Sequence, residues 1–207
     1  MRVLGWLTFL LFLVPILAAG QSLQENSGPW VMERSGTTAG LRGIHAVGGG
    51  VAWASGTNGT VLRTEDGGYE WQSCAMPPGA EKLDFRGIWA WDDNTAIVMS
   101  SGTGDASRLY KTTDGCSHWK LLFTNPDKEG FYDALLFVNR DYGLVLGDPA
   151  GGDTRGPVAF RIRLTNDGGE TWIPVGDPEL PHPSVNLTPL SGEAFFAASN
   201  SSMTVAG

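Results

Sequence analysis

The sequence predicts an all-β protein built from repeated four-stranded antiparallel units, and three observations predict it. A short motif with Thr, Asp, Gly and Trp occurs three times, and its aspartates, Asp66, Asp114 and Asp167, lie 48 and 53 residues apart. Apolar runs of about five residues, bounded by Gly, Asn, Asp and Pro, fill the intervals. Beyond the N-terminal segment, no stretch shows helical periodicity over about ten residues.

Each copy of the motif predicts a reinforced hairpin turn. The Asp carboxylate accepts hydrogen bonds from backbone N–H groups of its own turn, and glycine supplies the positive φ that the reversal needs. The Trp carries an apolar body into the space between neighbouring units. The residues with these structural roles are Thr64, Asp66, Gly68, Trp71, Thr112, Asp114, Trp119, Thr165, Asp167, Gly169 and Trp172. Cys116 stands in the middle copy where the other copies have Gly.

The apolar runs predict the strands of each unit. They cover residues 41–47, 51–55 and 60–63, then 85–90, 95–100, 108–111 and 119–123, then 134–138, 143–147 and 160–164. In the last run Arg161 and Arg163 alternate with apolar residues, which predicts a strand with solvent-facing arginines. A fourth unit opens with residues 185–187 and 194–198 and has no motif. The expected divisions are 21–40, 41–76, 77–124, 125–176 and 177–207, with residues 30–33 as a possible ring-closing strand.

The motif resembles the Asp-box (BNR) repeat of sialidase-type propellers and of many propellers without enzymatic activity. It is most similar to the secreted Asp-box propellers related to the photosystem II assembly and stability factor. The resemblance implies a β-propeller whose four-stranded units are blades. Propellers close with about 4–8 blades, so three blades and part of a fourth predict an incomplete ring. An incomplete sequence explains this, and a self-paired assembly of half-rings is the alternative.

The N-terminus has the design of a secretory signal peptide. Met1 and Arg2 precede an almost unbroken apolar stretch from Val3 to Leu17, and small residues then precede a cleavage site before Gln21. We therefore expect residues 1–20 to be removed on bacterial export, giving a secreted or periplasmic protein without stable membrane insertion. An uncleaved membrane anchor is the alternative interpretation.

Charge and cysteine content fit an exported protein. The net charge of −8 and the isoelectric point of about 4.8 argue against nucleic acid or an anionic membrane as the main partner. Cys74 and Cys116 are the two cysteines, and a lone pair in an oxidising compartment predicts a disulfide, with two separate thiols as the alternative. The three histidines show no metal-ligand spacing, so neither a metal nor a cofactor is expected.

Candidate binding residues lie on the face opposite the repeated turns, where the remaining loops of the resembled propellers gather. Arg42 and Arg86 occupy equivalent positions at the start of the innermost strand, and either is suited to a carboxylate or peptide acid; solvated strand-end arginines are the alternative. Tyr132 and Asp133 are roughly placed for the same face. Asp148 and Asp153 are weaker candidates for a cation, because two carboxylates in a Gly-rich loop fall short of a calcium-loop pattern.

Two classes of function remain. The first, which the sequence favours, is a non-enzymatic secreted propeller that binds a protein or peptide partner on the face opposite the Asp boxes. The alternative is a sialidase-type glycoside hydrolase, which needs an arginine cluster, a Tyr–Glu nucleophile pair and an acid Asp. Its catalytic residues would lie partly in a C-terminal half that this sequence lacks.

Overall fold

The structure is a computed structural model that describes residues 31–150, 159–175, 189–195 and 203. The chain divides into two units, residues 1–32 and 33–207, and all the strands described below belong to the second. Within the described residues there is no α-helix, and the single helical element is one 3₁₀ turn, η1 (Gly104–Ala106). The expected signal peptide, residues 1–20, lies outside the described residues.

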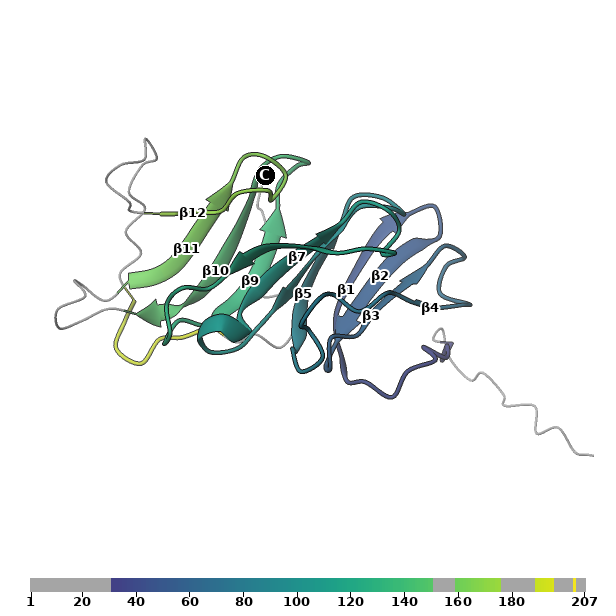
Figure 1. Cartoon of the computed structure of the whole chain (residues 1–207), viewed down its shortest axis with the longest axis horizontal. Coiled ribbons are helices and arrows are strands. Elements are labelled where there is room, and N and C mark those ends of the chain that lie inside the picture. Colours follow the sequence, from purple (N-terminus) through teal and green to yellow (C-terminus); the bar gives the residue numbers. More distant parts are fainter. Residues whose placement is uncertain (1–30, 151–158, 176–188, 196–202, 204–207) are drawn as a thin grey trace, which may run out of the picture. The chain divides into compact units, whose positions relative to one another are not determined.

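The described strands form three antiparallel sheets of four strands, each in the order of the chain (Figure 1). The first sheet contains β1 (Leu41–Gly48), β2 (Val51–Gly56), β3 (Val61–Thr64) and β4 (Gln72–Ser73). The second contains β5 (Phe85–Ala90), β6 (Ala96–Ser100), β7 (Arg108–Thr112) and β8 (Lys120–Thr124). The third contains β9 (Tyr132–Phe137), β10 (Gly143–Ala150), β11 (Ala159–Thr165) and β12 (Ile173–Pro174). The predicted all-β class with four-stranded antiparallel units is confirmed.

Several details differ from the expected strands. β9 begins at Tyr132, two residues before the expected run. β10 continues to Ala150 instead of ending at Gly147, because a register shift after Gly147 lets Pro149 and Ala150 pair with Phe160 and Ala159. Residues 31–33 form no strand, since no described sheet edge pairs with them. Most of the fourth unit lies outside the described residues, and its described part, 189–195, forms a turn closed by the Glu193 N–H on the Leu190 carbonyl.

The repeated motif forms the turn between the third and fourth strand of every sheet. In the third copy the Thr165 hydroxyl accepts the Gly169 N–H at 2.9 Å and donates to the Asp167 carboxylate at 2.8 Å. The same carboxylate then accepts the Thr171 N–H at 3.0 Å. The first two copies repeat this network from Thr64 and Thr112. One hydroxyl and one carboxylate thus satisfy backbone groups that the reversal leaves unpaired.

These hydrogen bonds keep the turn carboxylates ionised. Hydrogen bonds from the His118 side chain and backbone, with one from Thr112, lower the pKa of Asp114 to about 2. The Glu70 N–H and the Thr64 hydroxyl lower the pKa of Asp66 in the same way. Partial burial raises the pKa of Asp167, but hydrogen bonds from Thr171 outweigh it and leave that pKa lowered. An ionised carboxylate occupied by its own turn serves structure rather than catalysis.

Replacing Thr165 with Val is expected to lower the free energy of unfolding by about 1–3 kcal/mol, because the buried Gly169 N–H then loses its acceptor. Thr165→Ser is the matched control: it keeps the hydroxyl, so its loss should be a fraction of that value. Urea unfolding followed by tryptophan fluorescence measures both. Equal losses for Val and Ser would contradict a role for the hydroxyl.

Two apolar clusters join the sheets. The first contains Trp53, Phe85, Tyr110 and Trp119 and packs the first sheet against the second. The second contains Leu135, Phe137 and Trp172 with residues of β6 and β7, and it packs the second sheet against the third. Strands β1, β5 and β9, the first of each sheet, lie next to one another in the same order. The three sheets therefore stack through their faces, with their first strands side by side.

The motif tryptophans pack between neighbouring sheets where a neighbour is present. Trp119 and Trp172 are buried, each against the preceding sheet, as predicted. Trp71 is also mostly buried, as expected, but it is more exposed than the other two. The reason is positional, because no described sheet lies on the side of the first sheet that Trp71 faces.

A disulfide between Cys74 and Cys116 links the end of the first sheet to the turn of the second. The Ala75 N–H also donates to the Cys116 carbonyl at 3.1 Å. Cys116 adopts φ 67°, in the left-handed region that its glycine counterparts Gly68 (98°) and Gly169 (88°) also occupy. A cysteine at this position costs backbone energy, and the link between two sheets accounts for its presence there.

Candidate functional site

The strand register places the repeated turns and the starts of the first strands at opposite ends of each sheet. Each motif Thr pairs with the beginning of the second strand, as Thr112 does with Ala96. The first strand begins opposite the end of the second strand, as Phe85 does opposite Ser100. The end of each sheet at which the first strand begins is called the loop rim. It includes the loops of residues 57–60, 77–83, 101–107 and 125–131.

Three residues occupy the same place on the loop rim. Arg42, Arg86 and Asp133 are each the second residue of the first strand of their sheet. Asp84 lies between the two arginines, its carboxylate 3.4 Å from Arg42 Nε and 2.9 Å from Arg86 Nε. The arginine side chains are 41% and 29% exposed, so both guanidinium groups meet solvent as well as Asp84. Asp84 thus bridges the arginines of two adjacent sheets.

Asp133 differs from the two arginines in burial as well as in sign. Its side chain is buried, and one carboxylate oxygen has no hydrogen-bond partner among the described residues. Burial and the nearby charge of Asp148 raise the pKa of Asp133 to about 7, while the Asp148 N–H and the charge of Arg86 act in the opposite direction. A carboxyl group with that pKa changes charge near neutral pH.

Tyr132 is held inside the protein. Its ring is buried between the second and third sheets, and its hydroxyl accepts a hydrogen bond from Arg163 Nε at 2.8 Å. Burial raises the pKa of this hydroxyl although Arg163 lowers it. The Arg163 guanidinium also stacks 4.6 Å from the Phe123 ring centre. The Tyr132 hydroxyl, which is the group that would act as a nucleophile, is therefore enclosed between the packed sheets.

The expectation that Arg161 and Arg163 face solvent was wrong for Arg163. Its guanidinium contacts Tyr132 of β9 and Phe123 of the second sheet, whereas Arg161 is 34% exposed and pairs with Asp127 of the β8–β9 loop at 3.2 Å. The alternation of the strand is as predicted, but at Arg163 the polar face meets neighbouring side chains rather than water. Guanidinium groups tolerate such positions because their planes stack on aromatic rings.

Two polar hollows lie on the loop rim on either side of the segment from Asn125 to Lys128. One, of about 440 Å³, is lined by Thr103 to Asp105 together with Asn125, Pro126 and Lys128. The other, of about 210 Å³, lies over β11 beside Asn125, Asp127 and Tyr132. Both are lined by polar and apolar atoms together, which suits contact with a peptide segment.

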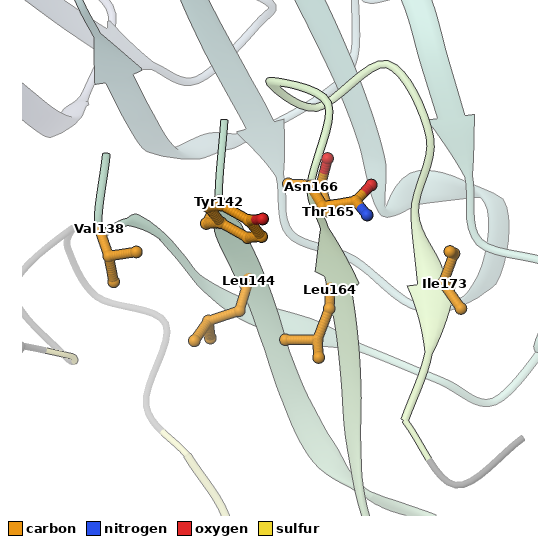
Figure 2. Close-up of a pocket in the computed structure, with 8 residues that line it drawn as sticks. Val138, Tyr142, Leu144, Leu164, Thr165, Asn166 and Ile173 are labelled. Atoms are coloured by element: carbon orange, nitrogen blue, oxygen red, sulfur yellow. The ribbon is translucent and has the colours of Figure 1, made fainter. Parts of the chain in front are cut away.

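An apolar pocket of about 250 Å³ lies on the face of the third sheet that points away from the second sheet. Figure 2 shows Leu144, Leu164 and Ile173, from neighbouring strands, around it. Leu144 pairs with Leu164 next to the repeated turn of the third sheet. The equivalent pairs are Trp53 with Arg63 in the first sheet and Ile97 with Lys111 in the second, so Leu144 is the counterpart of Trp53 and Ile97. Trp53 and Ile97 are fully buried by the sheet that follows them. The pocket thus continues the sheet-packing surface and is separate from the charged rim.

Comparison with known proteins places the fold. The chain matches no family model and no curated protein. Among solved structures it is similar to "YCF48 bound to D1 peptide", with 19% sequence identity and a TM-score of 0.57 over 72% of this chain and 44% of that chain. The chain has a β-propeller fold.

Two further propellers show weaker similarity. They are YCF48 from Cyanidioschyzon merolae, with 21% identity and a TM-score of 0.49 over 68% of this chain and 41% of that chain, and an ancestral GH74 enzyme. The GH74 enzyme has 16% identity and a TM-score of 0.48 over 66% of this chain and 18% of that chain. The chain spans less than half the length of each of these proteins. The three described sheets are blades of the propeller, and a partial ring is consistent with them.

Among the described residues, the remaining candidates form no metal site. Asp148 accepts the Phe195 N–H at 3.0 Å, and Asp153 lies outside the described residues. In the described part of the chain, no three His, Cys, Asp or Glu side chains group as metal ligands. None of its helical elements has the length and apolar character needed to span a bilayer.

Sequence reasoning missed Asp84, the residue that joins the two arginines. It directly precedes β5, but its counterpart in the first blade is Gly40, so comparison of the repeats shows no acidic residue at this place. Its contact with Arg42 crosses from one blade to the next, and only the stacking of the blades brings the two together. The single available signal was the equivalence of Arg42 and Arg86 in the first two repeats.

Proposed function

We propose that this chain is part of an exported, non-enzymatic β-propeller that binds a protein or peptide through its loop rim. Arg42 and Arg86 receive a carboxylate of the partner, such as a peptide C-terminus or an acidic side chain. The Arg42–Asp84–Arg86 group carries the proposal, because two partly exposed guanidinium groups lie at equivalent positions of adjacent blades. Guanidinium groups bind carboxylates with paired, charge-assisted hydrogen bonds.

The comparison with solved structures supports a peptide as the ligand. The structure with a TM-score of 0.57 to this chain is described as bound to a D1 peptide. That binding belongs to the other protein, and at 19% identity the likeness by itself establishes the fold alone. Together with the polar hollows of the loop rim, it favours an extended peptide over a small neutral ligand.

Export is part of the same proposal. The N-terminal signal-peptide pattern supports it, and so does the Cys74–Cys116 disulfide, because disulfides persist in oxidising compartments. The similarity of the repeated turns to Asp boxes supports a relation to the secreted Asp-box propellers.

The glycoside hydrolase alternative has less support from the described residues. A sialidase-type site needs an accessible tyrosine nucleophile with a glutamate partner. Tyr132 is buried and its hydroxyl accepts a hydrogen bond from Arg163 Nε, and Asp133 is buried as well. We therefore keep binding as the proposed function.

Changing Arg42 and Arg86 together to Ala is expected to weaken binding of a peptide with a free C-terminal carboxylate by at least about tenfold, because two charge-assisted contacts are lost. The melting temperature should fall only modestly: both arginines are partly exposed, although Asp84, 22% exposed, loses both of its ion-pair partners. Titration calorimetry and thermal unfolding measure the two effects.

Arg140→Ala is the matched control. Arg140 is 64% exposed and pairs with Asp92, and it lies at the end of the third sheet that carries the repeated turns. Its loss removes the same charge from the other rim, so binding should persist. Equal weakening by the control would reduce the effect to net charge, and a large drop in stability of the double variant would make both arginines structural.

A further inference from the structure

The third blade breaks the pattern of charge on the loop rim. At the position where the first two blades carry Arg42 and Arg86, the third carries Asp133. Strand β5 contacts both β1 and β9, so Arg86 lies between the Arg42 blade and the Asp133 blade. A carboxyl group at this place acts directly on the charge that the proposed partner would meet.

The surroundings of Asp133 decide how it acts. It is 2% exposed, so it cannot itself contact a partner that binds on the rim. Among the described residues, the charges that act on it are those of Arg86 from β5 and Asp148 from β10, and β6 carries no charged residue. Arg86 is joined through Asp84 to Arg42. Asp133 is thus a buried group whose charge acts on the binding surface electrostatically, through Arg86.

We propose that Asp133 is a proton-operated control of the Arg42–Asp84–Arg86 group, a step that rests on the proposed function. The ionised carboxylate competes with the partner for the charge of Arg86 and weakens binding. When Asp133 takes up a proton it becomes neutral and no longer attracts Arg86, so the partner's carboxylate binds more tightly. By linkage, a bound carboxylate also favours the protonated form of Asp133.

Two observations support this direction of control. One carboxylate oxygen of Asp133 has no described hydrogen-bond partner, so the ionised form is poorly solvated where it stands. Burial, with the charge of Asp148, raises the pKa of Asp133 to about 7, within the range where cellular compartments differ. A free carboxylate on the partner has a pKa of about 3.5 and stays ionised throughout that range.

The test uses the full chain and acetyl-tetraalanine with a free C-terminal carboxylate, titrated calorimetrically at pH 5.5, 7 and 8.5 and constant ionic strength. The wild-type Kd should be about fivefold lower at pH 5.5 than at pH 8.5, a coupling at the weak end of the usual range. Asp133→Asn should bind with the tighter Kd at every pH. Asp141→Asn, which removes an exposed carboxylate at the opposite, repeated-turn end of the third sheet, should keep the wild-type profile.

A second variant, at Asp148, tests the inference even if Asp133→Asn fails to fold. Asp148→Asn removes the charge that helps to hold the proton on Asp133, so the midpoint of the wild-type profile should move to lower pH. A pH dependence that survives in Asp133→Asn, or an unmoved midpoint in Asp148→Asn, would overturn the inference and leave the proposed function intact. Absence of binding at every pH, or equal binding of the C-terminal amide, would overturn the proposed function and the inference with it.

Discussion

Reduction of the Cys74–Cys116 disulfide is expected to lower the free energy of unfolding by about 4 kcal/mol, the value of the chain-entropy model for a loop of this size. The two cysteines are 42 residues apart, so the bridge closes a long loop in the unfolded chain. It also joins the first blade to the turn of the second, and its loss should loosen that interface first. Urea unfolding with and without reductant measures the difference.

Paired variants separate the bridge from the backbone at Cys116. Both Cys74→Ala/Cys116→Ala and Cys74→Ala/Cys116→Gly remove the disulfide and should be insensitive to reductant. The Gly version should lose about 0.5–1 kcal/mol less, because Cys116 has the positive φ that its counterparts Gly68 and Gly169 adopt. Wild-type unfolding that is unaffected by reductant would show that the bridge contributes nothing to stability.

Asp133→Asn is expected to stabilise the protein above neutral pH, by up to about 4 kcal/mol if the whole pKa shift is realised. The folded-state pKa of about 7 lies above the unfolded value, so the folded chain holds a proton that the unfolded chain has released. The wild type therefore loses stability as the pH rises from about 4 to about 7. Below pH 4 both states are protonated, and this contribution of Asp133 is fully present.

Chemical unfolding at pH 4, 6 and 8.5 tests this sign. The gap between Asp133→Asn and wild type should grow over that range, whereas Asp105→Asn, an exposed carboxylate, should change stability by less than about 0.5 kcal/mol. A gap that is constant with pH would mean that Asp133 titrates normally. This measurement needs no ligand, so it checks the charge state of Asp133 independently of binding.

The repeated motif shows how far local chemistry carries a prediction. Thr165, Asp167 and Gly169 interact within five residues of one another, so their hydrogen bonds follow from the sequence alone. The same holds for the strands, whose apolar runs end where the turn residues begin. Fold class and turn positions could be predicted for this reason.

Contacts between blades could not be predicted in the same way. The alternation of its strand predicts that Arg163 faces solvent, yet Arg163 contacts Tyr132 of β9 and Phe123 of β8. Trp71 has the same motif position as Trp119, but it lacks a described blade on the side that it faces. Strand alternation determines which residues share a face, and the stacking of sheets decides what that face meets.

The sequence by itself determined the all-β class, the four-stranded repeat, the turns and the equivalence of Arg42 and Arg86. Only the tertiary structure decided that Asp84 joins the two arginines and that Asp133 is buried beside Asp148. The physical reason is the range of the interactions. Turns and strand pairing depend on residues close in the chain, whereas burial and the charge of Asp133 depend on blades packed together from separate repeats.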